Sequence, residues 1–300
     1  MNKRNDFICI GAVHSDYILK LKQNYFKNRT NPINQEENLG GVAYNVAKIL
    51  SFLNQNTKLY SLNCNQKQKK EIKQQGIKFR ALNKKINKGH YTSILDVKGK
   101  MILGLANMDD YEKLNDYNVL KKYINKKIIL DLNLPAKIIE KIINKNAKKN
   151  YICVCGTSAH KIHKIEDLLK KIDTIILNKQ ESFALTSKKT IKDSMSYLIR
   201  KNKKLNIIIT NGKNAVNAYI NNVNYLAYPP STLIKNENGA GDALSAIFNY
   251  FFSYAYDELD VLNKSICGGS LQASGYKDNK EKYLQKIDKI SKLIKFKIIR

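Results

Sequence analysis

Four consecutive residues, Gly239, Ala240, Gly241 and Asp242, stand directly before a long apolar run in the C-terminal third of the chain. Small residues at the start of a helix expose backbone N–H groups at the positive end of the helix dipole, where phosphate oxygens bind. The carboxylate of Asp242 is placed to take a proton from a hydroxyl that attacks a phosphoryl group. The segment predicts an anion hole with a general base. A structural alternative stays open, in which Asp242 only stabilises the start of its own helix.

A second glycine pair, Gly40 and Gly41, opens another predicted helix, and Asn45 follows in the first turns of that helix. Neither glycine segment is a Walker loop or a dinucleotide-binding fingerprint. The G-A-G-D string lacks the G-K-[ST] ending of the first and the third glycine of the second. The chemistry must therefore be sought in the pair of segments together.

The two glycine segments, with four further motifs in order between residues 7 and 274, resemble the ribokinase-like (PfkB) family of sugar and nucleoside kinases. The further motifs are G-x-x-x-x-D (Gly11 and Asp16), D-x-N (Asp131 and Asn133), N-x-x-E (Asn178 and Glu181) and T-x-G (Thr210 and Gly212). The resemblance implies an α/β protein with the ribokinase-like three-layer αβα fold, a central mostly parallel sheet and a small β lid. It also implies an ATP-dependent kinase.

The resemblance assigns the acceptor side of the site. Asp16 and Asn45 would hydrogen-bond ribose hydroxyls, because a carboxylate and an amide together offer acceptors and donors to a diol. Gly40 and Gly41 would let the backbone approach the sugar closely. A predicted hairpin over residues 91–106 would cover the substrate, together with His14 and Thr92, and exclude water that would otherwise accept the phosphoryl group. Asp16 as a turn former and Asn45 as a helix cap are the structural alternatives.

On the donor side, Asp242 would deprotonate the 5'-hydroxyl while Gly239, Ala240 and Gly241 hold the charge on the transferred phosphoryl group. Asn178 and Glu181 would organise Mg²⁺ mainly through water, as this hydrated cation prefers; an ordinary helix start is the alternative for this pair.

Thr210 and Gly212 would line the ATP site. Asn236 stands where the family more often has Asp, which leaves open how a monovalent cation (K⁺) would be held near the anion hole.

Shorter strings, at residues 91–96, 99–101 and 106–112, are similar to pseudouridine kinases within the family. This implies the 5'-hydroxyl of pseudouridine as the acceptor. Ribokinase, a fructokinase-like sugar kinase, another nucleoside kinase and, as a different class, a non-catalytic binding protein remain as alternatives. Fold alone does not separate these.

The formal net charge of +28 raises the question of nucleic-acid binding. Only five of the 53 basic residues are arginine, the better partner for bidentate contacts with bases and phosphates, and the lysines are scattered along the chain. We therefore expect a solvated basic surface, small anionic or sugar substrates, and no specific nucleic-acid partner.

The five cysteines form an odd and irregular set, which indicates a reducing compartment rather than a disulfide framework. Cys153 and Cys155, followed by His160 and His163, raise the question of zinc, but their spacing is not the usual one of a structural zinc site. The two cysteines are therefore read as small buried residues of a core strand before a helix.

The elements that must position these residues follow a βα rhythm typical of a parallel sheet. Predicted strands cover residues 7–13, 58–62, 79–82, 127–132, 151–154, 174–177 and 206–210, with hairpins at 91–106 and 216–227. Predicted helices cover residues 42–54, 67–75, 135–146, 164–171, 191–201, 240–254, 259–274 and 281–294. We expect one kinase domain over residues 1–300, with lid segments at about 14–38 and 88–107. No apolar run is long enough for a membrane span and no cleavage site follows the basic N-terminus, so a cytoplasmic protein without a membrane partner is expected. A homodimer formed through the lid is left open by the resemblance.

Overall fold

A ten-stranded sheet runs through the centre of the part that the computed structural model describes, which is residues 4–115 and 123–299. Its spatial order is β14-β13-β12-β11-β10-β9-β8-β1-β4-β5. The strands from β11 to β5 in that order pair in parallel, and β12, β13 and β14 pair antiparallel. In chain order they are β1 (Asp6–Ile10), β4 (Asn56–Asn63), β5 (Lys78–Ile86), β8 (Lys127–Leu130), β9 (Tyr151–Cys155), β10 (Thr174–Asn178), β11 (Asn206–Asn211), β12 (Asn214–Ile220), β13 (Val223–Ala227) and β14 (Phe296–Ile299).

The central strands are buried on both faces. Along β1, Phe7 and Cys9 pack into one hydrophobic core, and Ile8 and Ile10 pack into a second core across the sheet. Burial on both faces is the reason that these strands read as continuous apolar runs rather than as alternating ones. The predicted α/β class with a mostly parallel sheet is confirmed.

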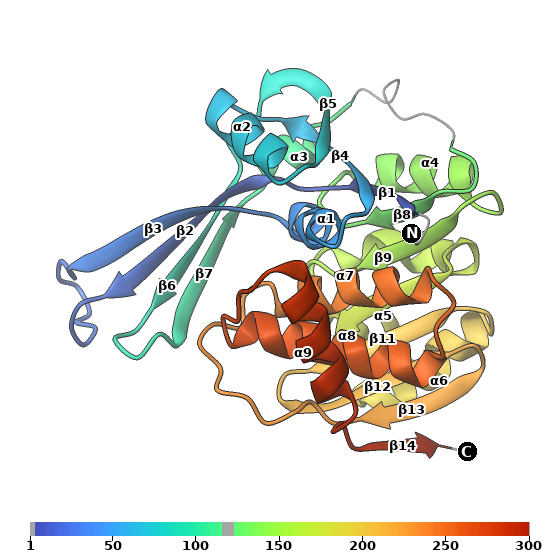
Figure 1. The fold of residues 1–300 in the computed structure, drawn as a ribbon. Coiled ribbons are helices and arrows are strands. Elements are labelled where there is room, and N and C mark those ends of the chain that lie inside the picture. Colours follow the sequence, from blue (N-terminus) through green and yellow to red (C-terminus); the bar gives the residue numbers. More distant parts are fainter. Residues whose placement is uncertain (1–3, 116–122, 300) are drawn as a thin grey trace.

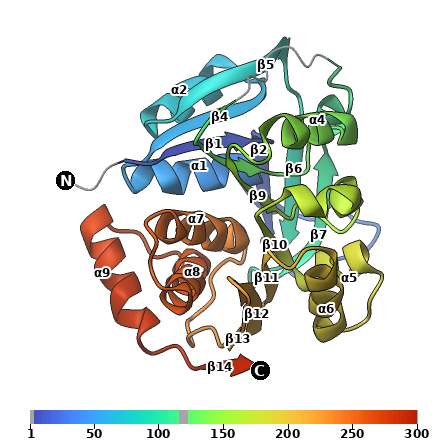
Figure 2. The same cartoon turned by 90° about the vertical axis from the view of Figure 1, so that its right-hand side faces the viewer.

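Helices cover the two faces and complete three layers (Figure 2). On one face lie α1 (Val42–Phe52), α7 (Ala240–Phe252), α8 (Glu258–Ala273) and α9 (Lys280–Ser291). On the other lie α4 (Ala136–Asn146), the 3₁₀ helix η1 (Ile162–Lys171), α5 (Lys179–Thr186) and α6 (Ile191–Lys201). Two shorter helices, α2 (Gln66–Gln74) and α3 (Asp109–Glu112), lie near β4 and β5 (Figure 1).

Several elements differ from the sequence prediction. The helix expected near residues 164–171 is a 3₁₀ helix, and its buried Ile162, Ile165 and Leu168 recur every three residues, the period of that helix. Helix α5 was considered only as the alternative for Asn178 and Glu181, since its side chains show little separation into an apolar and a polar face. Strand β14 was not predicted because all four of its side chains are exposed and so carry no burial pattern.

A second, four-stranded sheet, called the lid sheet below, projects from the body beside α1 (Figure 1). It contains β2 (His14–Leu21), β3 (Ile33–Gly40), β6 (His90–Leu95) and β7 (Met101–Asn107), in the order β3-β2-β6-β7. The β6–β7 hairpin was predicted. Segment 14–38 was expected in the β lid, but its two strands were not delimited; β3 is polar on both faces, and only its last two residues are buried. Asp16, expected on a loop, therefore lies on a strand.

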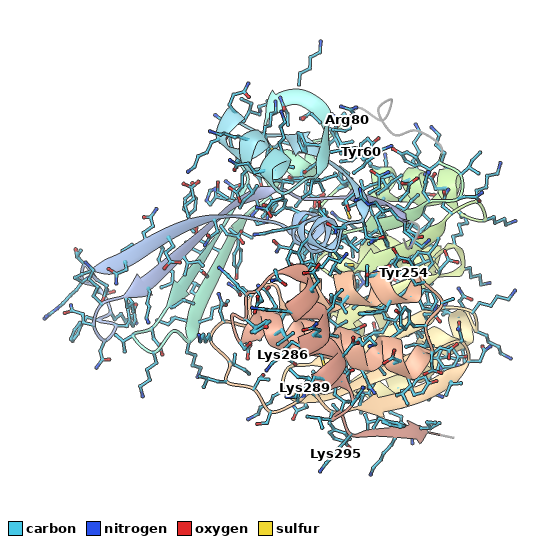
Figure 3. All side chains as sticks on the ribbon, viewed as in Figure 1. Tyr60, Arg80, Tyr254, Lys286, Lys289 and Lys295 are labelled. Carbon is cyan, nitrogen blue, oxygen red and sulfur yellow. The ribbon has the colours of Figure 1, made fainter. Side chains whose placement is uncertain are left out.

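Basic side chains lie at separate places in the fold. Arg80 is near one end of the molecule, while Lys286 and Lys289 on α9 and Lys295 ahead of β14 lie toward the other (Figure 3). The five cysteines are buried and unpaired with one another. Across residues 4–115 and 123–299, no helix is long and apolar enough to span a membrane.

Candidate active site

Helix α7 begins at Ala240, after Gly239 in a left-handed conformation with φ of 76°. The N–H of Ala240 donates to the carbonyl of Glu237 at 3.2 Å, so this donor is used within the loop. The N–H groups of Gly241 and Asp242 stand in the first turn, where a helix offers no backbone acceptor. The side-chain oxygen of Asn236 accepts a hydrogen bond from the N–H of Asn238, at 2.9 Å. The predicted anion hole thus reduces to the first-turn donors of α7.

Asp242 and Asn45 meet where α7 packs beside α1. Asn45 Nδ2 donates to Asp242 Oδ2 at 2.7 Å, although 197 residues separate them. Burial is the largest influence on Asp242 and, with the charges of Asp131 and Asp16, raises its pKa to about 6; the Asn45 hydrogen bond acts in the opposite direction. A carboxylate with a pKa close to neutrality is suited to accept and release a proton.

Asp16 reaches the same region from β2. Its Oδ1 is buried and lies 2.8 Å from His14 Nδ1, with which it forms an ion pair when the imidazole is protonated. His14 itself is 7% exposed. A carboxylate oxygen has two lone pairs, so Oδ1 can accept a further hydrogen bond beside its contact with His14. Asp16 is therefore equipped to accept a hydrogen bond from a hydroxyl.

Gly40 and Gly41 are required by the protein's own packing. A Cβ on Gly40 would lie 2.1 Å from Asp16 Oδ2, and one on Gly41 would lie 2.3 Å from the carbonyl oxygen of Ala12. Gly41 also has φ of 110°, which side chains disfavour. The expected collision with a sugar is thus not the only reason for these glycines, since the chain itself already fills the space.

Sequence reasoning gave Asp131 no role, yet it ties the site together. Its Oδ2 accepts from the N–H groups of Ala12 and Ala43 at 2.8 and 3.1 Å, and its Oδ1 accepts from Asn133 at 2.9 Å. The side chain is 1% exposed. Asp131 thereby joins the ends of β1 and β8 to the start of α1, the helix that carries Asn45. A D-x-N string shows none of these partners, which come from separate parts of the fold.

Asn178 and Glu181 form a capping box at the start of α5. Asn178 Oδ1 accepts from the N–H of Glu181 at 2.9 Å, and Glu181 Oε2 accepts from the N–H of Asn178 at 2.8 Å. Glu181 is 4% exposed, and burial, opposed by these hydrogen bonds and reinforced by the charge of Asp242, raises its pKa to about 7. The structural alternative for this pair is therefore present, whatever further role it has.

A cavity of about 660 Å³ lies next to the start of α7. Thr210 and Gly212 line it, as does Asn178, and it extends to Ala240 and Gly241. The wall also includes residues that the sequence motifs did not assign, among them Pro229, Pro230, Ser231, Thr232, Gly269, Ser270 and Ala273. Gly269 fits there because a Cβ would lie 3.0 Å from the carbonyl oxygen of Ala240. The packing of α8 against α7 brings Gly269, Ser270 and Ala273 to this wall, and the chain between β13 and α7 supplies residues 229–232.

Thr92 does not lie with the other acceptor-side residues. In the lid sheet Tyr91 pairs with Asp16 and Thr92 pairs with Tyr17. Because neighbouring residues of a strand point to opposite faces, Thr92 lies on the face away from Asp16, and Tyr91 lies on the face with it. This placement is contrary to the predicted contact of Thr92 with the substrate. A one-residue difference of this kind cannot be read without the strand register.

The model of the pfkB family carbohydrate kinases matches residues 4–258. The chain belongs to the PfkB family of carbohydrate kinases. It is thus a phosphotransferase with an alcohol group as acceptor, and the family implies ATP as the phosphoryl donor. The predicted family and enzyme class are confirmed.

Among curated proteins, this PfkB-family kinase is 30% identical over 193 residues to a pseudouridine-metabolizing bifunctional protein of Schizosaccharomyces pombe. The match covers 60% of this chain and 26% of that protein, so the kinase chain corresponds to about a quarter of its relative.

Solved structures share the fold of this PfkB-family kinase at low identity. A carbohydrate kinase from Agrobacterium tumefaciens is 20% identical, with a TM-score of 0.78 over 98% of this chain and 100% of that one. Arabidopsis thaliana ribokinase, solved with ribose and ATP, is 15% identical, with a TM-score of 0.75 over 95% and 99%. A nucleoside kinase from Methanocaldococcus jannaschii is 18% identical, with a TM-score of 0.72 over 96% and 99%. The predicted ribokinase-like fold is confirmed.

The resemblance implies a magnesium ion, and the question is which side chains could bind it. Among the described residues, no group of three or more His, Cys, Asp or Glu side chains is arranged to hold a metal ion. Glu181 is a buried carboxylate close enough to Asp242 for their charges to interact. A single buried carboxylate fits an ion that keeps most of its water, and Glu181 is the residue that would hold that water.

Proposed function

We propose that this kinase transfers the γ-phosphoryl group of ATP to the 5'-hydroxyl of a ribose-containing substrate, with pseudouridine as the acceptor. The hydrogen-bonded pair of Asn45 and Asp242, at the start of α7 and beside Asp16, carries the proposal. The kinship with a pseudouridine-metabolizing protein supports the choice of acceptor. The whole chain would act as one kinase domain, with the lid sheet over the acceptor.

On the acceptor side, Asp16 Oδ1 accepts a hydrogen bond from a ribose hydroxyl, in addition to its contact with His14. His14 lies against the same carboxylate oxygen and helps to hold it in place. Asn45 donates to Asp242 and offers its amide oxygen to the sugar. Asp242 then removes the proton of the attacking hydroxyl.

On the donor side, the cavity beside α7 holds ATP, with Thr210 and Gly212 along its wall. The first-turn N–H groups of Gly241 and Asp242 face the transferred phosphoryl group and stabilise the charge on it. When bound, Mg²⁺ supplies further neutralisation of the phosphate charge, and Asn178 and Glu181 are the residues that would hold its water.

The lid sheet also supports a homodimer as a proposal, because several apolar side chains of β7 are about half exposed: Met101, Ile102, Leu103 and Leu105. The molar mass in solution, measured by light scattering, tests it, and a monomer at all concentrations would contradict it.

The pH dependence of kcat should show an acid limb set by Asp242. This carboxylate must be ionised to accept a proton, and its pKa is raised to about 6. We expect kcat to be constant above that value and to fall about tenfold for each pH unit well below about 6. In Asn45→Ala, the hydrogen bond that lowers the pKa is gone, so the limb should move to higher pH. An acid limb that stays in place in Asn45→Ala would contradict this origin.

The choice of acceptor is tested by ADP release from ATP and Mg²⁺ with pseudouridine, uridine, adenosine, ribose and fructose. We expect the highest kcat/KM with pseudouridine. Turnover with another acceptor alone would support the kinase assignment and contradict pseudouridine as the substrate. A folded protein that turns over none of the five acceptors would instead favour a binding protein that has lost turnover.

A further inference from the structure

Tyr91 is the aromatic side chain on the site face of the lid sheet beside Asp16. The two residues are direct partners in the parallel ladder of β2 and β6. Paired residues of neighbouring strands point to the same face, so the phenol and the carboxylate stand side by side. They are close enough that the charge of Asp16, after burial, contributes to raising the pKa of Tyr91. Whatever sugar binds Asp16 therefore has Tyr91 next to it.

The ring of Tyr91 extends over the neighbouring strand β7. A Cβ on Gly104 would lie 2.3 Å from the Tyr91 hydroxyl and 3.1 Å from Cζ. The φ angle of Gly104 is not positive, so its backbone conformation does not require glycine. Glycine is needed at this position because it leaves space for the Tyr91 ring. The phenol thus rests against the backbone of β7 at a position where any larger residue would lift it away.

No hydrophobic core explains this arrangement. All residues of β7 are exposed, and Tyr91 belongs to neither of the two core clusters. Its hydroxyl has one weak contact, with Met101 Sδ at 3.8 Å. A partly exposed aromatic ring held against a sheet, beside a residue that binds ribose, is a surface on which a planar base stacks.

We propose that Tyr91, seated on Gly104, is the base-stacking platform of the acceptor site, so that the acceptor is a nucleoside rather than a free sugar. This rests on the proposed function, since it takes Asp16 as the ribose ligand. The base attached to C1' of the ribose lies on the phenol ring while the 5'-hydroxyl faces Asp242. Pyrimidine and purine bases both have a face to stack, so Tyr91 selects the class of acceptor and not the individual base.

The test compares Tyr91→Leu, Tyr91→Phe and Gly104→Ala with the parent protein, using Thr92→Val as the matched control on the opposite face. The kcat and KM are measured for pseudouridine, uridine, adenosine and ribose, and nucleoside binding is measured by calorimetry without ATP. In Tyr91→Leu and Gly104→Ala we expect KM and Kd for nucleosides to rise about 10- to 100-fold, with kcat nearly unchanged. Tyr91→Phe, which keeps the ring, should restore nucleoside binding, and Thr92→Val should behave as the parent.

Several results would overturn the inference. One is an unchanged nucleoside KM and Kd in Tyr91→Leu, which would leave the kinase assignment intact. Another is a fall of kcat at constant KM, which would make Tyr91 a part of lid closure. Turnover of ribose or fructose alone by the parent protein would contradict the assignment of a nucleoside as the acceptor. Conversely, absence of turnover together with nucleoside binding that Tyr91→Leu weakens would support the platform and remove the proposed function.

Discussion

Replacing Asp242 with asparagine should lower kcat about a thousandfold, the order expected for the loss of a general base. The amide has nearly the same shape as the carboxylate but cannot take the proton of the attacking hydroxyl. Its side-chain oxygen can still accept from Asn45 Nδ2, which now donates to Asp242 at 2.7 Å. The contacts of α1 with α7 should therefore survive, and with them the binding of the acceptor.

The measurement is kcat by coupled ADP release, with acceptor Kd from calorimetry and the midpoint of thermal unfolding as a check on folding. Asp167→Asn is the matched control, because Asp167 is an exposed carboxylate on η1. The control should keep full activity. If Asp242→Asn keeps more than about a tenth of parental kcat, a different group accepts the proton.

Much of the main body could be predicted from the sequence because its signals are local. The central strands are buried on both faces, so they appear as uninterrupted apolar runs such as β10 and β11. Helices such as α4 and α6 bury one stripe of side chains and so show a helical period. Both kinds of pattern come from a core that extends along the whole element.

The lid sheet is less predictable because it has almost no core. β3 has six exposed or partly exposed residues in succession, so nothing in its pattern distinguishes a strand from a polar loop. β14 is placed only by its antiparallel pairing with β13. Where pairing rather than burial defines a strand, the partner strand has to be known first.

The candidate site shows the same division. The motifs placed Asp16, Asn45 and Asp242 in the chain, and the structure brings them together at the contact of α1, α7 and β2. The assignment of Thr92 depended on a strand register that no local pattern contains. The walls of the cavity come from α8 and the loop before α7, which meet only in the folded protein.

Asp131 leads to the prediction with the largest effect on stability. Its carboxylate is 1% exposed and accepts three backbone hydrogen bonds, from Ala12, Ala43 and Asn133. In Asp131→Ala these N–H groups lose their acceptor within the core, and each buried donor left without a partner costs about 1–3 kcal/mol. We expect the free energy of unfolding to fall by about 3–5 kcal/mol, a large share of the total for a typical domain.

Asp131→Asn separates the hydrogen bonds from the volume of the side chain. One amide oxygen can still accept from Ala12 and Ala43, but the amide nitrogen then faces the N–H of Asn133, two donors against each other. Its loss of stability should therefore lie between those of Asp131→Ala and the parent. Urea denaturation gives the three free energies, with Asp167→Ala as an exposed control that should change little.

Because the charge of Asp131 raises the pKa of Asp242, the acid limb of kcat in Asp131→Asn should also move to lower pH. Equal stability of Asp131→Ala and the parent would mean that these backbone groups have another acceptor, and the link from β1 and β8 to α1 would have to be sought elsewhere.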